Sequence, residues 1–169
     1  MVSLEELASN EEIKAEYRKT LLLNILKKLV GRMRNDGNYR LHILNLYKQS
    51  TNKVITSKVI LNKEFNYAVS ETDAEMFNTW MIAHFNKSDR RKGFSDIFKE
   101  QLYDKQNGLC AVCGEKLGRD FSKIHVDHII PWTLVGDELH NNYQYLCNTC
   151  NESKSCHTDY IFKNLINLV

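Results

Sequence analysis

Four cysteines in two matched pairs are the residues of this chain best suited to binding a metal. Cys110 and Cys113 form one C-x-x-C pair, and Cys147 and Cys150 form the other. Each such turn brings two thiolates within reach of one ion, and two turns complete the tetrahedral shell that Zn²⁺ prefers. A shell filled by protein ligands leaves no position for a substrate, so the pattern predicts a structural zinc. The fifth cysteine, Cys156, is interpreted as incidental.

The segment between and just after these pairs carries a second group of reactive side chains. Asp127 offers a hard oxygen ligand for a cation such as Mg²⁺, and the neighbouring His128 can take a proton from water near neutral pH. Asn151 directly follows the second pair and adds an amide oxygen as a further ligand. Two protein ligands leave open positions for water and a phosphate, which is how Mg²⁺ usually binds. The sequence therefore predicts a catalytic cation site beside the structural zinc.

A strand and a short helix are predicted to position these residues. Apolar and β-branched residues that end at Pro131 indicate a strand over residues 123–130, and Asn151 is expected at the start of a helix. Alternation along a strand would direct Asp127 and His128 to opposite faces. Both can serve one site only where the strand bends or ends, and Pro131 supplies a reason for such an end.

The upstream part of the chain is predicted to be mainly helical. Asn10, followed by acids and by apolar residues at helical spacing, predicts a long helix that stops at residues 35–38. The pattern of residues 39–47 leaves helix and strand open, whereas the β-branched composition of residues 53–61 favours a strand. Two further helices are expected over residues 71–85 and 94–106.

Composition limits the class of protein. The chain has 169 residues, and its 23 Lys and Arg against 21 Asp and Glu give a formal net charge of +2. This mildly basic balance neither requires nor excludes a nucleic-acid partner. No apolar stretch reaches the roughly 20 residues of a membrane span, and the first residues do not read as a signal peptide. We therefore expect a cytoplasmic, intracellular protein without a membrane partner, in a compartment where cysteines stay reduced.

Two regions are expected. Residues 1–92 would form a mainly helical region of unknown role, and residues 93–169 would form the metal-binding domain, with Gly93 at the boundary. The most basic short stretch of the chain, residues 86–92, directly precedes this boundary. It is interpreted either as a solvated linker or as a set of phosphate contacts.

The combined motifs resemble the zinc-containing HNH endonucleases, which carry the ββα-metal motif. The similar stretch covers residues 103–154 and includes C-A-V-C-G, V-D-H-I-I-P-W, N-N-Y-Q-Y-L-C and C-N-E-S-K. The resemblance implies an α+β fold, in which a ββα-metal nuclease domain with a structural four-cysteine zinc follows a mainly helical N-terminal region.

The resemblance also implies roles for individual residues and a reaction. His128 would be the general base that activates water, and Asp127 and Asn151 would hold a catalytic Mg²⁺ or Mn²⁺. Asn142 would orient the loop that bears the histidine. The implied reaction hydrolyses phosphodiester bonds in double-stranded DNA and leaves 5′-phosphate and 3′-hydroxyl ends. Weaker candidates for contacts with the substrate are Arg90, Arg91, Lys92, His125 and Lys154.

Two departures from the family pattern and one alternative class stay open. Asn151 stands where many relatives have histidine, which bears on metal preference, and residues 134–138 replace a frequent Gly-Gly loop. The alternative is a non-catalytic, zinc-stabilised module that binds nucleic acid or protein. Restriction and phage defence are candidate settings, and residues 1–92 are candidates for contacts in a homodimer or with a partner protein. The sequence does not decide the target, DNA against RNA, or the oligomeric state.

Overall fold

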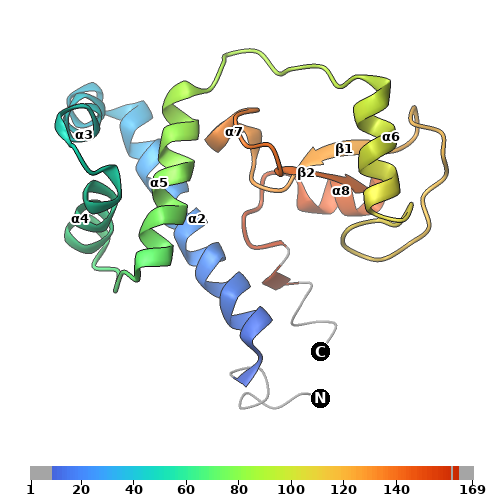
Figure 1. Ribbon diagram of the computed structural model, residues 1–169, viewed down its shortest axis with the longest axis horizontal. Coiled ribbons are helices and arrows are strands. Elements are labelled where there is room, and N and C mark those ends of the chain that lie inside the picture. The colour runs from blue at the N-terminus through green and yellow to red at the C-terminus, as the bar shows by residue number, and fades with distance from the viewer. Residues whose placement is uncertain (1–8, 161, 164–169) are drawn as a thin grey trace. The chain divides into compact units, whose positions relative to one another are not determined.

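The computed structural model describes residues 9–160, 162 and 163, and it divides into two compact units that part between Asn86 and Lys87 (Figure 1). This point lies earlier in the chain than the predicted boundary at residues 92 and 93. Lys87 donates a hydrogen bond to the backbone oxygen of Thr133, and the backbone amide of Lys92 donates to Asp137, which explains why both lysines belong to the second unit. In the described ranges, no helix has both the length and the apolar character that crossing a membrane requires.

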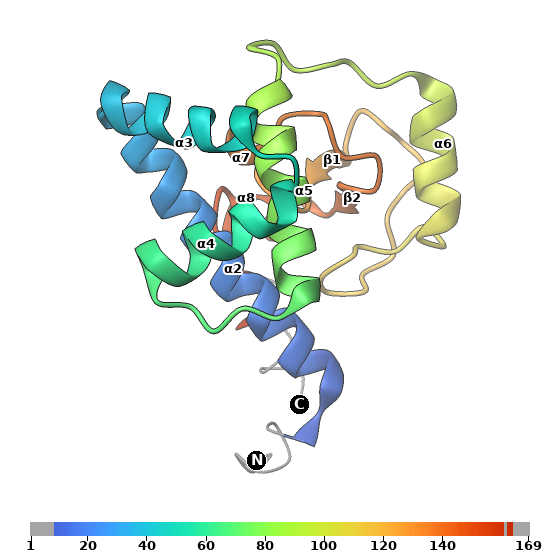
Figure 2. The same ribbon diagram turned by 60° about the vertical axis from the view of Figure 1, so that its left-hand side comes forward.

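The first unit is built from helices, as predicted. Asn10 caps its long first helix by accepting hydrogen bonds from the backbone amides of Glu12 and Ile13. The described helices of this unit are α2 (Glu11–Asn35), α3 (Gly37–Gln49), α4 (Lys53–Phe65) and α5 (Glu71–Asn86). Helix α2 packs against α3 and α5, and α4 packs against α5 (Figure 2).

The prediction of a strand over residues 53–61 is wrong, because these residues lie in helix α4. Asn52 accepts hydrogen bonds from the amides of Val54 and Ile55 and so caps the helix. The buried face of α4 packs against α5. A cap and tertiary burial together outweigh the weak strand preference of β-branched residues. Residues 39–47, for which the sequence left helix and strand open, form part of α3.

The second unit holds a two-stranded antiparallel sheet with helices packed on it, which confirms the predicted α+β class. Asp127 lies opposite Gln144 across the strands, and His128 lies opposite Tyr143. In the described part of this unit the elements are α6 (Asp96–Lys105), β1 (His125–His128), α7 (Trp132–Val135), β2 (Tyr143–Leu146) and α8 (Asn148–Lys154). Helix α6 packs on β2, and α8 contacts both strands.

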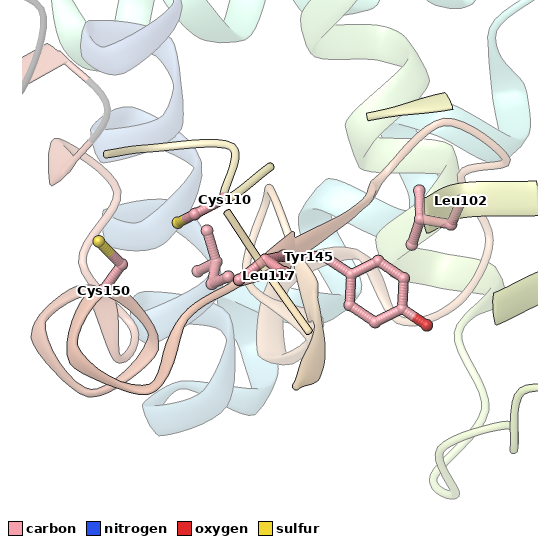
Figure 3. Packing of buried hydrophobic residues seen from close by; sticks show 6 residues of the cluster. Leu102, Cys110, Leu117, Tyr145 and Cys150 are labelled. Carbon is pink, nitrogen blue, oxygen red and sulfur yellow. The ribbon is translucent and has the colours of Figure 1, made fainter. Parts of the chain in front are cut away.

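The apolar cluster of the second unit is small and includes cysteines (Figure 3). One cysteine of each C-x-x-C pair is buried in it, beside side chains of α6 and β2. Two of the candidate metal ligands are therefore also part of the apolar core of this unit. The buried members are Leu102, Cys110, Leu117, Tyr145, Leu146 and Cys150.

Strand β1 is shorter than the predicted strand over residues 123–130, and Asn142 is the reason. The backbone amide of Ile129 donates to the backbone oxygen of Asn142 at 2.9 Å. The Asn142 side chain then pairs with both polar groups of the next peptide, with Ile130 N to Oδ1 at 2.7 Å and Nδ2 to Ile130 O at 2.9 Å. A side chain thus replaces the next rung of the sheet, and the chain leaves the strand directly after His128.

Candidate active site

The four paired cysteines come together at one point. Their sulfur atoms all lie within 4.8 Å of one another, and the sulfurs of Cys113 and Cys147 are 3.8 Å apart. A tetrahedral ion with Zn–S bonds of about 2.3 Å requires sulfur–sulfur separations of about 3.8 Å. The described cysteines of the two pairs are therefore positioned to bind a metal ion, and their separation fits zinc.

The thiols of the cluster differ in pKa, because their surroundings differ. Burial opposes ionisation of Cys110, but backbone amides, including those of Cys113 and Cys147, donate to its sulfur and lower its pKa to about 7. Burial raises the pKa of the Cys150 thiol to about 12. Cys110 thus ionises readily, whereas Cys150 needs a nearby cation to do so. A metal that binds this group would therefore displace protons.

A cavity of about 240 Å³ lies beside β1 and α8. Asp127, His128 and Asn151 all line it, so the structure brings together the three residues that the sequence grouped as a cation site. All four residues of β1 border the cavity, so the alternation of side chains along the strand does not keep Asp127 and His128 apart. Other candidates from the sequence that line it are Arg91, His125 and Lys154.

Asp127 is held through one of its two carboxylate oxygens. Its Oδ2 accepts a hydrogen bond from Gln144 Nε2 at 3.0 Å and lies 2.8 Å from Lys154 Nζ. Within the described residues, Oδ1 has no hydrogen-bond partner. The carboxylate is therefore fixed in orientation while one oxygen is left for a cation.

Lys154, a candidate from the sequence for contact with the substrate, is buried, with only 1% of its surface exposed. Besides its ion pair with Asp127, its Nζ donates to the backbone oxygen of His128 at 2.7 Å. A buried ammonium requires such partners, because its desolvation is costly. Lys154 thus ties α8 to the end of β1 and places Asn151, one helical turn earlier, beside the same strand.

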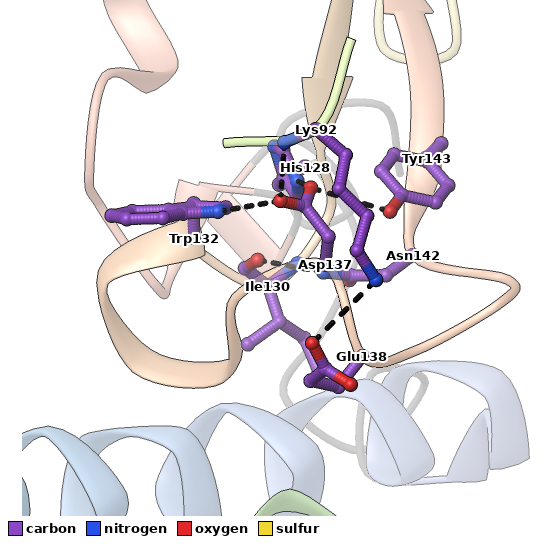
Figure 4. Close-up of polar contacts among 8 residues, drawn as sticks. All are labelled: Lys92, His128, Ile130, Trp132, Asp137, Glu138, Asn142 and Tyr143. Carbon is purple, nitrogen blue, oxygen red and sulfur yellow. Dashed lines mark hydrogen bonds and ion pairs between the residues drawn. The ribbon is translucent and has the colours of Figure 1, made fainter. Parts of the chain in front are cut away.

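His128 is buried and oriented by its neighbours (Figure 4). Its Nε2 lies 2.8 Å from Oδ1 of Asp137. The ring of Tyr143 packs edge-on against the imidazole with centroids 5.0 Å apart, and the ring of Phe94 lies 6.4 Å away. These contacts restrict rotation of the imidazole.

Asp137 is a central residue of the site that the sequence analysis missed. Its side chain is only 2% exposed. Burial opposes its charge, but donors that include the backbone amide of Lys92, then His128 and Trp132, outweigh it and hold the pKa of the carboxyl below its usual value. The only sequence signal was its place after Gly136 in the loop where the chain departs from the family pattern.

Of the other site residues predicted from the sequence, some line the cavity and others do not. Asn142 does not line it, but pairs with Ile130 as described above. Arg90 and Lys92 are exposed and lie outside the described lining. Arg91 lines the cavity, and its guanidinium lies 5.3 Å from the centroid of the Trp132 ring. Cation–π contacts of this kind are weak at exposed sites but orient the cation.

Comparison of the sequence with models of known families gives a match. The family model described as HNH endonuclease matches residues 110–159, a segment that includes both cysteine pairs and most residues of the cavity. The match confirms the resemblance found in the sequence for this part of the chain. No solved structure matches the protein.

Replacing Cys150 by Ser should remove bound zinc and unfold the second unit, because its small apolar cluster includes the metal ligands. Metal analysis and circular dichroism would measure both effects. The matched control is Cys156→Ser, which changes an exposed thiol outside the cluster and should retain the parent's zinc content. A Cys150→Ser protein that keeps its zinc and its fold would contradict the assignment.

Replacing Lys154 by Met should lower the free energy of unfolding by about 3 kcal/mol, because it leaves the Asp127 carboxylate without its cation. Urea unfolding at fixed zinc concentration would measure this loss. Adding Asp127→Asn to the same chain should recover part of it, since the unpaired charge is then gone. A loss below about 0.5 kcal/mol in Lys154→Met would mean that the pair contributes no more than a surface contact.

Proposed function

We propose that this protein is a metal-dependent endonuclease that hydrolyses phosphodiester bonds in DNA, because residues 110–159 match the family model described as HNH endonuclease. The observation that carries the proposal is the cavity that Asp127, His128 and Asn151 line together, in the same unit that gathers the four cysteines. A purely structural zinc module has no need of these three side chains in one cavity.

In the proposed reaction, His128 is the general base. An O–H bond of water breaks, and its proton passes to the imidazole. The water oxygen forms a bond to phosphorus while the bond from phosphorus to the 3′ oxygen breaks. The 3′ oxygen takes a proton from solvent, so the products are a 5′-phosphate and a 3′-hydroxyl. Restricted rotation of the imidazole between Tyr143 and Asp137 supports this role, because a base must be held in position.

Asp127 and Asn151 are the proposed protein ligands of the catalytic cation. Asp127 Oδ1 and the Asn151 amide oxygen are hard ligands, and both residues line the cavity. A divalent cation such as Mg²⁺ or Mn²⁺ at this place would supply Lewis-acid stabilisation of negative charge on the phosphate and on the leaving oxygen. Asn142 is proposed to hold the chain after His128 in place through its pairing with Ile130.

The four cysteines are proposed to hold a structural Zn²⁺, whose shell they complete. Thiols can bind a metal only when they are reduced, which suits the reducing cytoplasm, where we propose that the protein works. Restriction or phage defence remains a hypothesis for its biological role, and it rests only on the type of domain.

The proposed DNA contact begins at Arg91, which stands at the cavity over Trp132. Double-stranded DNA is the proposed substrate. Lys87 Nζ lies 5.3 Å from the same indole ring, so two cations gather at this wall. Such cations suit phosphates that flank the scissile bond. The exposed residues Arg90, Lys92 and His125 are proposed as further, weaker contacts.

Replacing His128 by Ala should reduce plasmid cleavage by about 10²- to 10⁴-fold, the usual contribution of a general base. Gel assays with Mg²⁺, Mn²⁺ or a chelator would measure it, and cleavage should require a divalent cation. His140→Ala is the matched control, because His140 is exposed and lies outside the cavity lining. If His128→Ala cleaves as well as the parent, the proposed mechanism is wrong. Binding without any cleavage in the parent would favour the non-catalytic module.

Replacing Arg91 by Ala should weaken DNA binding and reduce the slope of log K against log salt by about 0.9, the effect of one lost phosphate contact. Fluorescence anisotropy over a salt series would measure the slope. Arg119→Ala is the control, because Arg119 is engaged by Glu100 and Asp104 away from the cavity. An unchanged slope in Arg91→Ala would remove this residue from the DNA interface.

A further inference from the structure

The loop after β1 carries Asp137 to His128 through a turn that requires glycine. Gly136 has φ +62°, a region that residues with side chains rarely adopt. A Cβ atom at Gly136 would come within 2.6 Å of the Cβ atom of Lys87. The backbone therefore turns sharply against Lys87, and the next residue, Asp137, is brought into the interior with its carboxylate beside the imidazole.

Both oxygens of Asp137 are surrounded by donors (Figure 4). Oδ2 accepts from the indole Nε1 of Trp132 at 2.9 Å and from the backbone amide of Lys92 at 3.0 Å. Oδ1 lies 2.8 Å from His128 Nε2 and accepts from the Tyr143 hydroxyl at 3.4 Å. An indole and a backbone amide can only donate. Oδ2 therefore carries no hydrogen. Burial opposes the charge, but the donors outweigh it and hold the pKa of this carboxyl below its usual value, so Oδ1 carries no hydrogen either. The carboxylate is an anion that can only accept.

This arrangement determines which nitrogen of His128 carries the hydrogen. A carboxylate that can only accept requires Nε2 to be the N–H group, so the neutral imidazole has its lone pair on Nδ1. Within the described residues, Nδ1 has no hydrogen-bond partner, and His128 lines the cavity. The nitrogen that can accept a proton is thus the one that no protein group occupies.

We propose that Asp137 is the positioning residue for His128: it selects the Nε2–H tautomer, holds the ring, and leaves Nδ1 to take the proton of the attacking water. This inference rests on the proposed nuclease function. During the reaction the proton passes from water to Nδ1, and Asp137 stays ionised. Its negative charge then stabilises the imidazolium that forms.

A merely structural role for Asp137 is the competing explanation, because the same carboxylate also anchors Trp132 and Lys92. The Asp137→Asn variant separates the two. The single oxygen of an amide can still accept from Trp132 and Lys92, which keeps the loop in place. The NH₂ group then faces His128, where it favours a lone pair on Nε2 and hence the opposite tautomer.

Two measurements on the full-length, zinc-loaded protein test the proposal. The first is a long-range ¹H–¹⁵N spectrum of the histidine side chains at a pH where they are neutral, with His128→Ala used to assign the resonance. The parent should show the Nε2–H tautomer for His128, and Asp137→Asn should shift it towards Nδ1–H. The second is cleavage under saturating DNA. Asp137→Asn should lower kcat by about 10²- to 10⁴-fold and change KM by less than about threefold.

Glu138→Gln is the matched control, since it removes the same charge from the next residue. Glu138 pairs with Lys92 Nζ at 3.7 Å and makes no contact with His128 among the described interactions. This variant should keep the parent's kcat and its His128 tautomer. An equal loss of kcat in Glu138→Gln and Asp137→Asn would overturn the proposal, because the effect would then follow charge in the loop and not the contact with His128.

The outcomes separate this proposal from the proposed function. If His128→Ala is inactive while Asp137→Asn keeps the parent's kcat, His128 acts without Asp137 and only this inference fails. If His128→Ala cleaves normally, the nuclease mechanism fails. A parent protein whose His128 is the Nδ1–H tautomer overturns the inference without any variant, so the test holds even where Asp137→Asn does not fold.

Discussion

The convergence of four sulfur atoms is the constraint on which the second unit depends. Its apolar cluster is small, and Cys110 and Cys150 belong to it. The first cysteine pair lies in the turn after α6, and the second pair leads from β2 into α8. One ion at this point would therefore join segments that are separated by more than thirty residues of chain, as the separation of Cys113 and Cys147 shows. Asn151 follows this junction directly, so its position relative to β1 is a consequence of the sulfur cluster.

The second unit also holds two carboxylates with little exposure, and neighbouring groups in the site compensate the charge of each. Asp127 is matched by Lys154, and Asp137 is matched by a ring of N–H and O–H donors. Each would be costly if left alone in the interior. Together they surround His128, with Lys154 on its backbone oxygen and Asp137 on its ring. The electrostatic environment of the imidazole is thus built from groups that also hold the strand end and the loop.

The sequence was informative where local signals act and silent where partners lie far apart. Asn10 and the apolar period after it predicted α2, and the cysteine spacing predicted the metal cluster. The strand predicted over residues 53–61 failed because a cap and tertiary burial decided the outcome. Asp137 was missed because its importance appears only when the loop turns back on His128. The functional roles of the site residues remain predictions.

The close approach of Gly136 to Lys87 has a practical consequence for where the second unit starts. The family match covers residues 110–159, yet the backbone amide that supports the Asp137 carboxylate comes from Lys92, and the side chain above the Trp132 ring comes from Lys87. A fragment limited to residues 110–159 would keep both cysteine pairs and His128 but would lose these contacts of Lys87 and Lys92. The compact second unit therefore begins at Lys87, well upstream of its first cysteine.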